Sequence, residues 1–403
     1  MHGFSANGQA VTLADTAANL LAPANASVLS LVSAVTLSAD ATVSAVQAAA
    51  LQVLSGFTLG GHHLTIADSI GALIALDPAT ATMATSIVLA NGGIVSAAQF
   101  SALQALLHLA LNDNTLYVVD TAANLLPLVG GSTALASGIL LQGNATLTAD
   151  QAEALTTLPN FSALPGHIAI SDTVADLLRV TGAGPLPDDW AGELIATTIT
   201  LTSSATVTAA LADELAALGG RLVLGGFSLT VSDAAATLVT GVHTAGLALA
   251  TQVTVMGPEP GMTAAVATAL AGLAHFNKGG NSVTVADTAA NLASAGNAAG
   301  IALADHVQLN TAATLSVVAA EGLIGLANFQ SNGAAALTIA DTLPHLVQLG
   351  AVSLPHNDAL LRATPIGLSE NTTATVAQMA ALAALPEYAH FSLNGFSDRK
   401  SVV

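Results

Sequence analysis

Seven aspartates recur through the chain at nearly constant spacing, each just after a short apolar segment. They are Asp15, Asp68, Asp120, Asp172, Asp233, Asp287 and Asp341. A column of stacked carboxylates could bind calcium, which prefers oxygen ligands. Each aspartate also stands where an Ala-rich helix is expected to begin, and the free amides of a helix start need acceptors. We therefore predict that the seven are structural caps, with weak calcium binding between coils as the alternative.

Eleven histidines raise the question of a transition-metal site. Only His62 and His63 are adjacent, and no His-Glu-x-x-His pattern or other histidine and carboxylate cluster occurs. His275 and His390 both stand just before a phenylalanine, at the same place in the repeat. The chain has no cysteine and so no thiolate ligand. We predict no metal site.

Catalytic patterns are also missing from the sequence. There is no nucleophile elbow, Walker loop or dinucleotide fingerprint, and the paired glycines do not have phosphate-binding spacing. The paired carboxylates Asp188-Asp189 and Asp213-Glu214 fall in an insertion and on a helix face respectively. We expect no enzymatic activity and no cofactor.

Charge and hydropathy exclude two further classes of partner. The chain has 25 acidic and six basic residues, too few cations to hold nucleic acid phosphates. No uninterrupted run of eighteen apolar residues appears, so we expect no membrane span. The first residues, Met1 to Ala10, lack the basic and long apolar regions of an ordinary signal peptide.

Two series of short apolar segments surround the aspartates, and both have the alternation of β-strands. The first series is centred on Thr12, Thr65, Val118, Ala169, Thr230, Thr284 and Thr338. The second is centred on Thr36, Val88, Leu140, Thr200, Thr254, Gln308 and Gly367. Every repeat is thus expected to supply two strands.

Helices are expected after both strands. The first follows Asp-Thr-Ala-Ala-Asn-Leu, intact at 15–20, 120–125 and 287–292, where Asp or Thr can cap the helix. The second follows a Ser or Thr cap at positions such as Ser44 and Ser96. Crossovers of this length allow parallel strands and favour a right-handed coil.

The predicted fold is α/β: one right-handed β-α-β-α solenoid of about seven coils over residues 1–403, with parallel strand stacks and Ala-rich helices. The coils start near residues 11, 64, 116, 168, 229, 283 and 337. Insertions at about 181–192, with the single tryptophan Trp190, and at 355–365 are expected to be surface loops.

A phenylalanine ends most of the predicted second helices. These residues are Phe57, Phe161, Phe227, Phe276, Phe329 and Phe391. Equivalent positions superpose in stacked coils, so we predict a buried ladder of rings.

The Asp-Thr-Ala-Ala-Asn segments at 15–19, 120–124 and 287–291 resemble the repeats of very long bacterial secreted or cell-surface proteins, described as β-strand repeat or adhesin-like proteins. The resemblance covers nearly the whole chain and implies an extracellular or cell-surface location in bacteria. Many such proteins also carry Gly-Gly-x-Gly-x-Asp calcium repeats. None occurs in this sequence, so a calcium requirement does not carry over.

The two ends of the sequence are versions of one segment, with Phe-Ser-x-Asn-Gly at 4–8 and 391–395. Residues 389–403 read as the start of an incomplete eighth coil. A solenoid end exposes apolar surface and unpaired strand groups, so we predict that copies complete each other's terminal coils. The predicted assembly interface comprises Phe4, Val11, Leu13, Phe391, Val402 and Val403.

Such head-to-tail contacts do not close and generate filaments. The sequence therefore predicts a structural subunit of an extracellular filament or biofilm matrix, a homopolymer without nucleic acid partners. The alternative is a spacer or binding segment of a bacterial surface adhesin, which would contact glycan or protein through the insertion loops.

Overall fold

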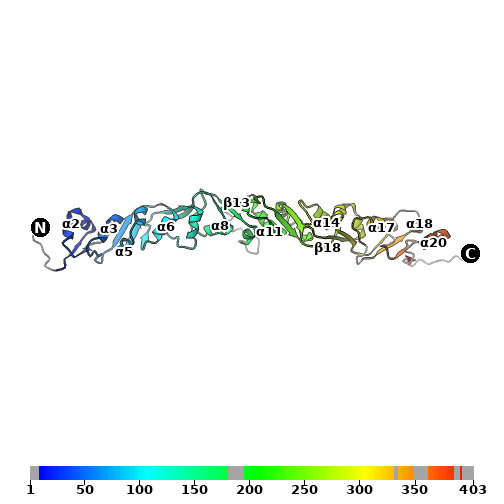
Figure 1. Cartoon of the computed structure of the whole chain (residues 1–403), viewed down its shortest axis with the longest axis horizontal. Coiled ribbons are helices and arrows are strands. Elements are labelled where there is room, and N and C mark those ends of the chain that lie inside the picture. Colours follow the sequence, from blue (N-terminus) through cyan, green and yellow to red (C-terminus); the bar gives the residue numbers. More distant parts are fainter. Residues whose placement is uncertain (1–8, 180–194, 331–334, 348–361, 385–390, 393–403) are drawn as a thin grey trace. The chain divides into compact units, whose positions relative to one another are not determined.

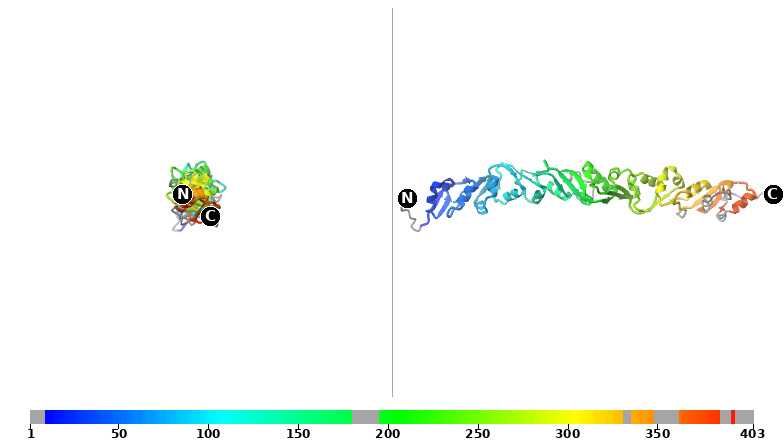
Figure 2. Two further views of the ribbon diagram at one scale, coloured as in Figure 1. Left: turned by 90° about the vertical axis from the view of Figure 1, so that its right-hand side faces the viewer. Right: turned by 45° about the horizontal axis from the view of Figure 1, so that its top comes forward.

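The computed structural model describes residues 9–179, 195–330, 335–347, 362–384 and 391–392. The chain forms two compact units, Met1–Thr200 and Leu201–Val403. In each unit short helices alternate with strands (Figures 1 and 2). The strands pair in parallel in both units. The predicted α/β class with parallel sheets and helices is therefore confirmed.

Both predicted series of segments are strands. The first series is β1 (Thr12–Asp15), β4 (Leu64–Asp68), β8 (Leu116–Asp120), β12 (Ile168–Asp172), β16 (Leu229–Asp233), β19 (Val283–Asp287) and β22 (Leu337–Asp341). The second series is β2 (Ala34–Leu37), β5 (Ser86–Leu89), β9 (Gly138–Leu141), β13 (Ala196–Leu201), β17 (Gln252–Val255), β20 (His306–Leu309) and β23 (Ile366–Leu368).

The structure also contains two kinds of short strand that the sequence analysis did not anticipate. A third series directly precedes the longer helices: β3 (Ala41–Val43), β6 (Gly93–Val95), β10 (Ala145–Leu147), β14 (Ala205–Val207), β18 (Glu259–Met262) and β21 (Ala313–Leu315). A fourth kind follows some of those helices: β7 (Leu109–Ala110), β11 (Phe161–Ser162), β15 (Leu222–Val223) and β24 (Phe391–Ser392). All of these strands except β18 have two or three residues and are too short to show a period of two. The predicted β-α-β-α order is therefore incomplete.

Helices of two lengths alternate along the chain. The longer ones are α3 (Ala45–Gln52), α6 (Ala97–Gln104), α8 (Ala149–Thr156), α11 (Ala209–Ala217), α14 (Ala264–Ala271), α17 (Val317–Ile324) and α20 (Val376–Ala383). The shorter ones are α1 (Ala17–Leu21), α2 (Ala26–Leu29), α4 (Ile70–Ile74), α5 (Pro78–Met83), α7 (Ala122–Leu125), α9 (Val174–Arg179), α12 (Ala235–Leu238), α13 (Thr244–Leu249), α15 (Ala289–Ala293), α16 (Ala298–Leu303) and α18 (Leu343–Val347). Single 3₁₀ turns are η1 (Pro23–Asn25), η2 (Leu126–Leu128), η3 (Gly219–Arg221) and η4 (Ala295–Asn297).

The longer helices begin at side-chain caps. Ser44 Oγ accepts from the Gln47 amide, and Gln47 Oε1 accepts from the Ser44 amide, which makes a complete capping box. The same reciprocal pair starts α6, α8 and α20. Because a capping box satisfies two otherwise free amides, these helices form where the sequence predicts them.

Apart from the β1-β2 sheet, which lies within the first repeat, each sheet combines strands from neighbouring repeats. In the first unit the orders are β1-β2, β3-β4-β5-β7, β6-β8-β9-β11 and, within that unit, β10-β12-β13. In the second unit they are β14-β16-β17, β18-β19-β20 and β21-β22-β23-β24. Strands β5 and β6 follow each other in the chain but lie in different sheets. The bend at residues 90–92 that joins them therefore links one sheet to the next.

The core consists of branched side chains from the strands and small ones from the helices. Leu64 and Ile66 of β4 are fully buried, as are Ala48 and Leu51 of α3. Alanine at the helix contact positions lets a short helix lie close to its sheet. This explains why a chain rich in Ala, Leu and Val needs few aromatic residues.

The predicted buried phenylalanine ladder is wrong. Phe329 is buried, but Phe57, Phe161 and Phe276 are only partly buried, and Phe227 is 38% exposed. Phe227 lies in the turn before β16, because the short strand of its repeat begins earlier, at Leu222. We therefore expect Phe227→Ala to behave as a surface substitution.

A left-handed residue precedes most of these short strands or bridges. Gly56, His108, Asn160, His275 and Asn328 all have φ between 55 and 62°. Glycine adopts this conformation freely, and asparagine and histidine are enriched in it among other residues. The recurrence of histidine before phenylalanine is therefore explained at His275 by backbone conformation; His390 lies outside the described residues.

Candidate assembly surfaces

Six of the seven recurring aspartates join two helix starts. Asp287 Oδ1 accepts from the Thr288 amide at 2.7 Å and from Asn291 Nδ2 at 2.8 Å, at the start of α15. Its Oδ2 accepts from the Ala264 amide at 2.9 Å, the first residue of the preceding long helix α14. One carboxylate thus holds the end of a strand and the starts of two helices together. We call this arrangement an aspartate junction.

The contact to the preceding long helix recurs at six junctions. The Oδ2 atoms of Asp68, Asp120, Asp172, Asp233, Asp287 and Asp341 accept from the amides of Ala45, Ala97, Ala149, Ala209, Ala264 and Val317 respectively. The donors lie 23 or 24 residues before the acceptors. This second role of the aspartates was not predicted from the sequence. The signal that could have revealed it is the constant separation between the residue after each Ser or Thr cap and the next aspartate.

The Asp-Thr-Ala-Ala-Asn segment closes the first turn of its own helix. Asn19 and Asn124 donate from Nδ2 to Oδ1 of Asp15 and Asp120, each at 2.7 Å. In the last such repeat a histidine takes the place of this asparagine, and His345 Nδ1 lies 2.8 Å from Asp341 Oδ1. A ring nitrogen can replace the amide because it can also donate a hydrogen bond.

Hydrogen bonds keep these carboxylates ionised. Burial raises the pKa of Asp287, but the bonds from Asn291, Ala264 and Thr288 outweigh it and leave the pKa below its usual value. The same balance lowers the pKa of Asp120 and Asp341. The hydrogen bonds already engage both oxygens of each carboxylate. Among the described residues no three His, Asp or Glu side chains group together as metal ligands.

Asp213, one of the paired carboxylates at 213–214, contacts residues at the start of the neighbouring helix α13. Asp213 Oδ2 lies 2.6 Å from His243 Nδ1, and Asp213 Oδ1 accepts from the Gly246 amide at 2.7 Å. Gly246 packs so closely on α11 that an added Cβ would lie 2.7 Å from Ala212 Cβ. Asp213 therefore fixes α13 against α11. The other pair, Asp188-Asp189, lies outside the described residues.

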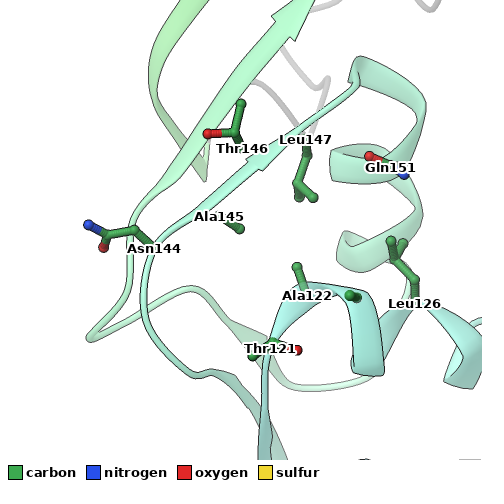
Figure 3. Close-up of a pocket in the computed structure, with 9 residues that line it drawn as sticks. Thr121, Ala122, Leu126, Asn144, Ala145, Thr146, Leu147 and Gln151 are labelled. Carbon is green, nitrogen blue, oxygen red and sulfur yellow. The ribbon is translucent and has the colours of Figure 1, made fainter.

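A shallow depression lies between the start of α7, strand β10 and Gln151 of α8 (Figure 3). Thr121, Ala122, Leu126 and Leu147 contribute to its lining, and no lining residue is ionisable. Gln151 Oε1 already accepts from the Thr148 amide. This depression therefore offers methyl, hydroxyl and amide groups but no acid or base.

The first aspartate junction is half occupied. Asp15 Oδ1 accepts from the Thr16 amide and from Asn19 Nδ2, each at 2.7 Å. Its Oδ2 has no hydrogen-bond donor among the residues that the structure describes. Strand β1 pairs with β2 on one side, whereas β4 pairs with both β3 and β5. One edge of β1 is therefore unpaired within the described part of the chain.

The apolar side chains of β1 and of Val11, directly before it, reflect this open edge. Val11 and Leu13 are partly exposed. Their equivalents in the second repeat, Leu64 and Ile66, are fully buried. The difference arises because a short strand and a long helix of the preceding repeat cover β4, and no described element covers β1 in this way.

Helix α20 is the long helix of a junction whose following strand and aspartate are missing from the described residues. Val376 is 89% exposed and Met379 is 43% exposed, and only Leu382 of this helix is buried. In α17 the equivalent side chains of Val317 and Ala320 are fully buried. The described residues contain no first-series strand after α20 that could cover Val376.

The other residues of the predicted interface are placed differently. Phe391 begins β24, which pairs with β23 of the same chain through Ile366. Phe4, Val402 and Val403 lie outside the described residues, as do the insertion around Trp190 and most of the insertion at 355–365. The structure thus brings Val11 and Leu13 to an open edge, and the exposed side chains of α20 are an addition that the sequence analysis missed.

Searches of family models, curated proteins and solved structures found no match for this chain. Among the described residues, no helix has both the length and the apolar character that a bilayer crossing requires.

Proposed function

We propose that this protein is a structural subunit of an extracellular filament or surface matrix of bacteria, and that copies assemble head to tail. In this proposal the repeats form one right-handed solenoid of about seven coils, each built on the β-α-β-α plan with the added short strands. The observation that carries the proposal is the pair of half-occupied junctions, at Asp15 and at α20.

Two features support self-assembly. The open edge of β1 carries backbone groups that a strand can pair with, and unpaired edges are templates for strand addition. The exposed valine and methionine of α20 occupy positions that are fully buried in α17. Exposed apolar side chains at a position that is elsewhere buried are typical of an interaction surface.

The alternative function is a spacer or binding segment of a bacterial adhesin. The adhesin alternative is favoured by the unusually long segment between the consecutive recurring aspartates Asp172 and Asp233, which contains the single tryptophan. Under this alternative the loops contact glycan or protein and the repeats hold them at a distance.

Sedimentation velocity and electron microscopy of the purified chain distinguish the two functions. We expect the sedimentation coefficient to rise with concentration and filaments to appear in micrographs. Deleting residues 1–13 removes half of β1 and should abolish filaments, while circular dichroism shows that the remaining repeats stay folded. A chain that remains monomeric at high concentration contradicts assembly and leaves the adhesin spacer as the better proposal.

Location is tested separately. Antibody labelling of intact cells of the source bacterium should detect the protein on the surface or in the surrounding matrix. Detection only after lysis contradicts an extracellular role.

A further inference from the structure

We infer that the open edge of β1 is the docking site for residues Thr372–Ala374 and helix α20 of a second copy of this chain. This inference rests on the proposed self-assembly and specifies which segments meet and in which register. It replaces the predicted pairing of residues 1–13 with residues 389–403.

Internal junctions provide the register. Ala41, Thr42 and Val43 pair in parallel with Leu64, Thr65 and Ile66. Ala313–Leu315 pair in the same way with Leu337–Ile339. In both cases the first three residues named directly precede the Ser cap of a long helix. The strand they pair with continues for two residues beyond the last pair and ends at the junction aspartate.

The same alignment can be made between β1 and the segment that precedes α20. Thr375 caps α20, so the three residues before it are Thr372, Thr373 and Ala374. Asp15 ends β1, so the matching positions are Thr12 and Leu13 of β1 and Val11 directly before it. The inferred pairs are therefore Thr372 with Val11, Thr373 with Thr12 and Ala374 with Leu13.

Two polar contacts follow from this register. At every regular internal junction the amide of the first short-strand residue donates to the residue before the paired strand, as Ala41 does to His63 O at 2.9 Å. The amide of Thr372 would donate to Ala10 O in the same way. The amide of Val376 would donate to Asp15 Oδ2, the position that Ala45 holds toward Asp68.

The apolar contacts follow as well. Val376 and Met379 would be covered by β1 and α1 of the second copy, as Val317 and Ala320 are covered within the chain. Ala374 is smaller than Leu315, its counterpart in β21, so it removes less apolar area from water. The contact between copies should therefore be weaker than an internal junction, and assembly should be reversible.

Disulfide cross-linking tests the register directly, because the chain has no cysteine of its own. The variant with Thr12→Cys and Thr373→Cys places one thiol on each side of the inferred junction. Neighbouring parallel strands hold paired residues within the range that a disulfide needs. On mild oxidation we expect a ladder of covalent dimers, trimers and longer chains.

Three controls define the result. Thr42→Cys with Thr65→Cys reproduces the same pair inside the chain and should cross-link within a monomer. Ala14→Cys with Thr373→Cys shifts the register by two residues and should cross-link at a much lower yield. Each single-cysteine variant can give dimers but no ladder.

The outcomes separate the two proposals. A ladder for the Thr12 and Thr373 pair supports the inference, and an equal ladder for the shifted pair overturns the register. If filaments form under reducing conditions but oxidation gives no ladder, the inference fails and the proposed function stands. If neither filaments nor a ladder form, both fail.

Two substitutions probe the contacts without cross-linking. Asp15→Ala removes the acceptor for Val376 and should raise the critical concentration for assembly about tenfold, as expected for loss of a charge-assisted hydrogen bond. Val376→Asp should abolish assembly, and its matched control Val318→Asp, on an exposed position of α17, should leave assembly unchanged. Equal behaviour of the two Asp variants contradicts the inferred surface.

Discussion

Helices α17 and α20 have the same length and begin at the same kind of cap, yet their apolar faces differ in exposure. Val317, Ala320 and Leu323 of α17 are fully buried. Val376 and Met379 of α20 are exposed although α20 has a complete capping box. The helix therefore forms from local signals, and its burial depends on the strand and aspartate of the next repeat.

The aspartates show the same contrast. Asp341 bonds to the start of α17 and to its own helix, whereas the bonds of Asp15 to described residues all lie within its own helix start. An occupied junction thus combines the burial of apolar side chains with a carboxylate that two helix starts share. Helices α1 and α20 still form at the half-occupied junctions. The following experiments compare occupied junctions with half-occupied ones, from the largest expected effect to the smallest.

Phe100 and Met379 occupy equivalent positions in α6 and α20. Phe100 is fully buried, so Phe100→Ala should lower the free energy of unfolding by about 3–5 kcal/mol through lost burial and a new cavity. Met379→Ala should cost below about 1 kcal/mol, because its side chain is already partly in water. Urea denaturation with hydrogen exchange on each helix measures both, and similar costs would contradict the contrast.

Asp287 and Asp15 differ in the number of helix starts they hold. Asp287→Ala leaves the Ala264 amide without its acceptor and should cost about 1–3 kcal/mol. Asp15→Ala loses an exposed cap and should destabilise the monomer less than Asp287→Ala does. Thermal unfolding at low protein concentration compares the two. A larger loss for Asp15→Ala would show that the second bond at Asp287 does not stabilise the fold.

Acid should weaken the junctions through these carboxylates. Their folded pKa values are lowered, by the Ala45 hydrogen bond in Asp68 and by the Asn19 hydrogen bond in Asp15. Their contribution is thus complete above the unfolded pKa of about 3.9 and is lost as the pH falls through the folded value. These carboxylates should therefore leave the free energy of unfolding nearly unchanged between about pH 7 and 5. They should lower it once the pH drops below about 4.

The variant Asp287→Asn separates this effect from general acid denaturation. It cannot ionise at that position, so its unfolding free energy should depend less on pH below about 4 than that of the wild type. An identical slope in both proteins would show that this junction does not contribute.

Calcium removal should have no effect. The oxygens of the buried junction aspartates Asp120, Asp287 and Asp341 are engaged by backbone and side-chain donors. Addition of a chelator should therefore leave the melting temperature unchanged. A drop of more than about 5 °C, which corresponds to 1 kcal/mol or more, would favour a calcium column instead.

Much of the local structure could be predicted from the sequence. The two regular strand series followed from the alternation of β-branched residues, and the long helices followed from Ser or Thr caps before Ala-rich segments. These signals act between residues close in the chain, so the local sequence contains them. The three Asp-Thr-Ala-Ala-Asn segments marked the starts of α1, α7 and α15 for the same reason.

The tertiary structure alone decided which contacts cross from one repeat to the next. The three-residue strand β3 exists because β4 pairs with it, and Asp68 reaches the amide of Ala45 only when the sheet brings them together. Phe227 is exposed because its repeat places Leu222 at the start of the short strand. Val376 follows a cap residue just as Val317 does, but Val317 lies beside the paired strand β22, and no strand of the described residues covers Val376 in this way.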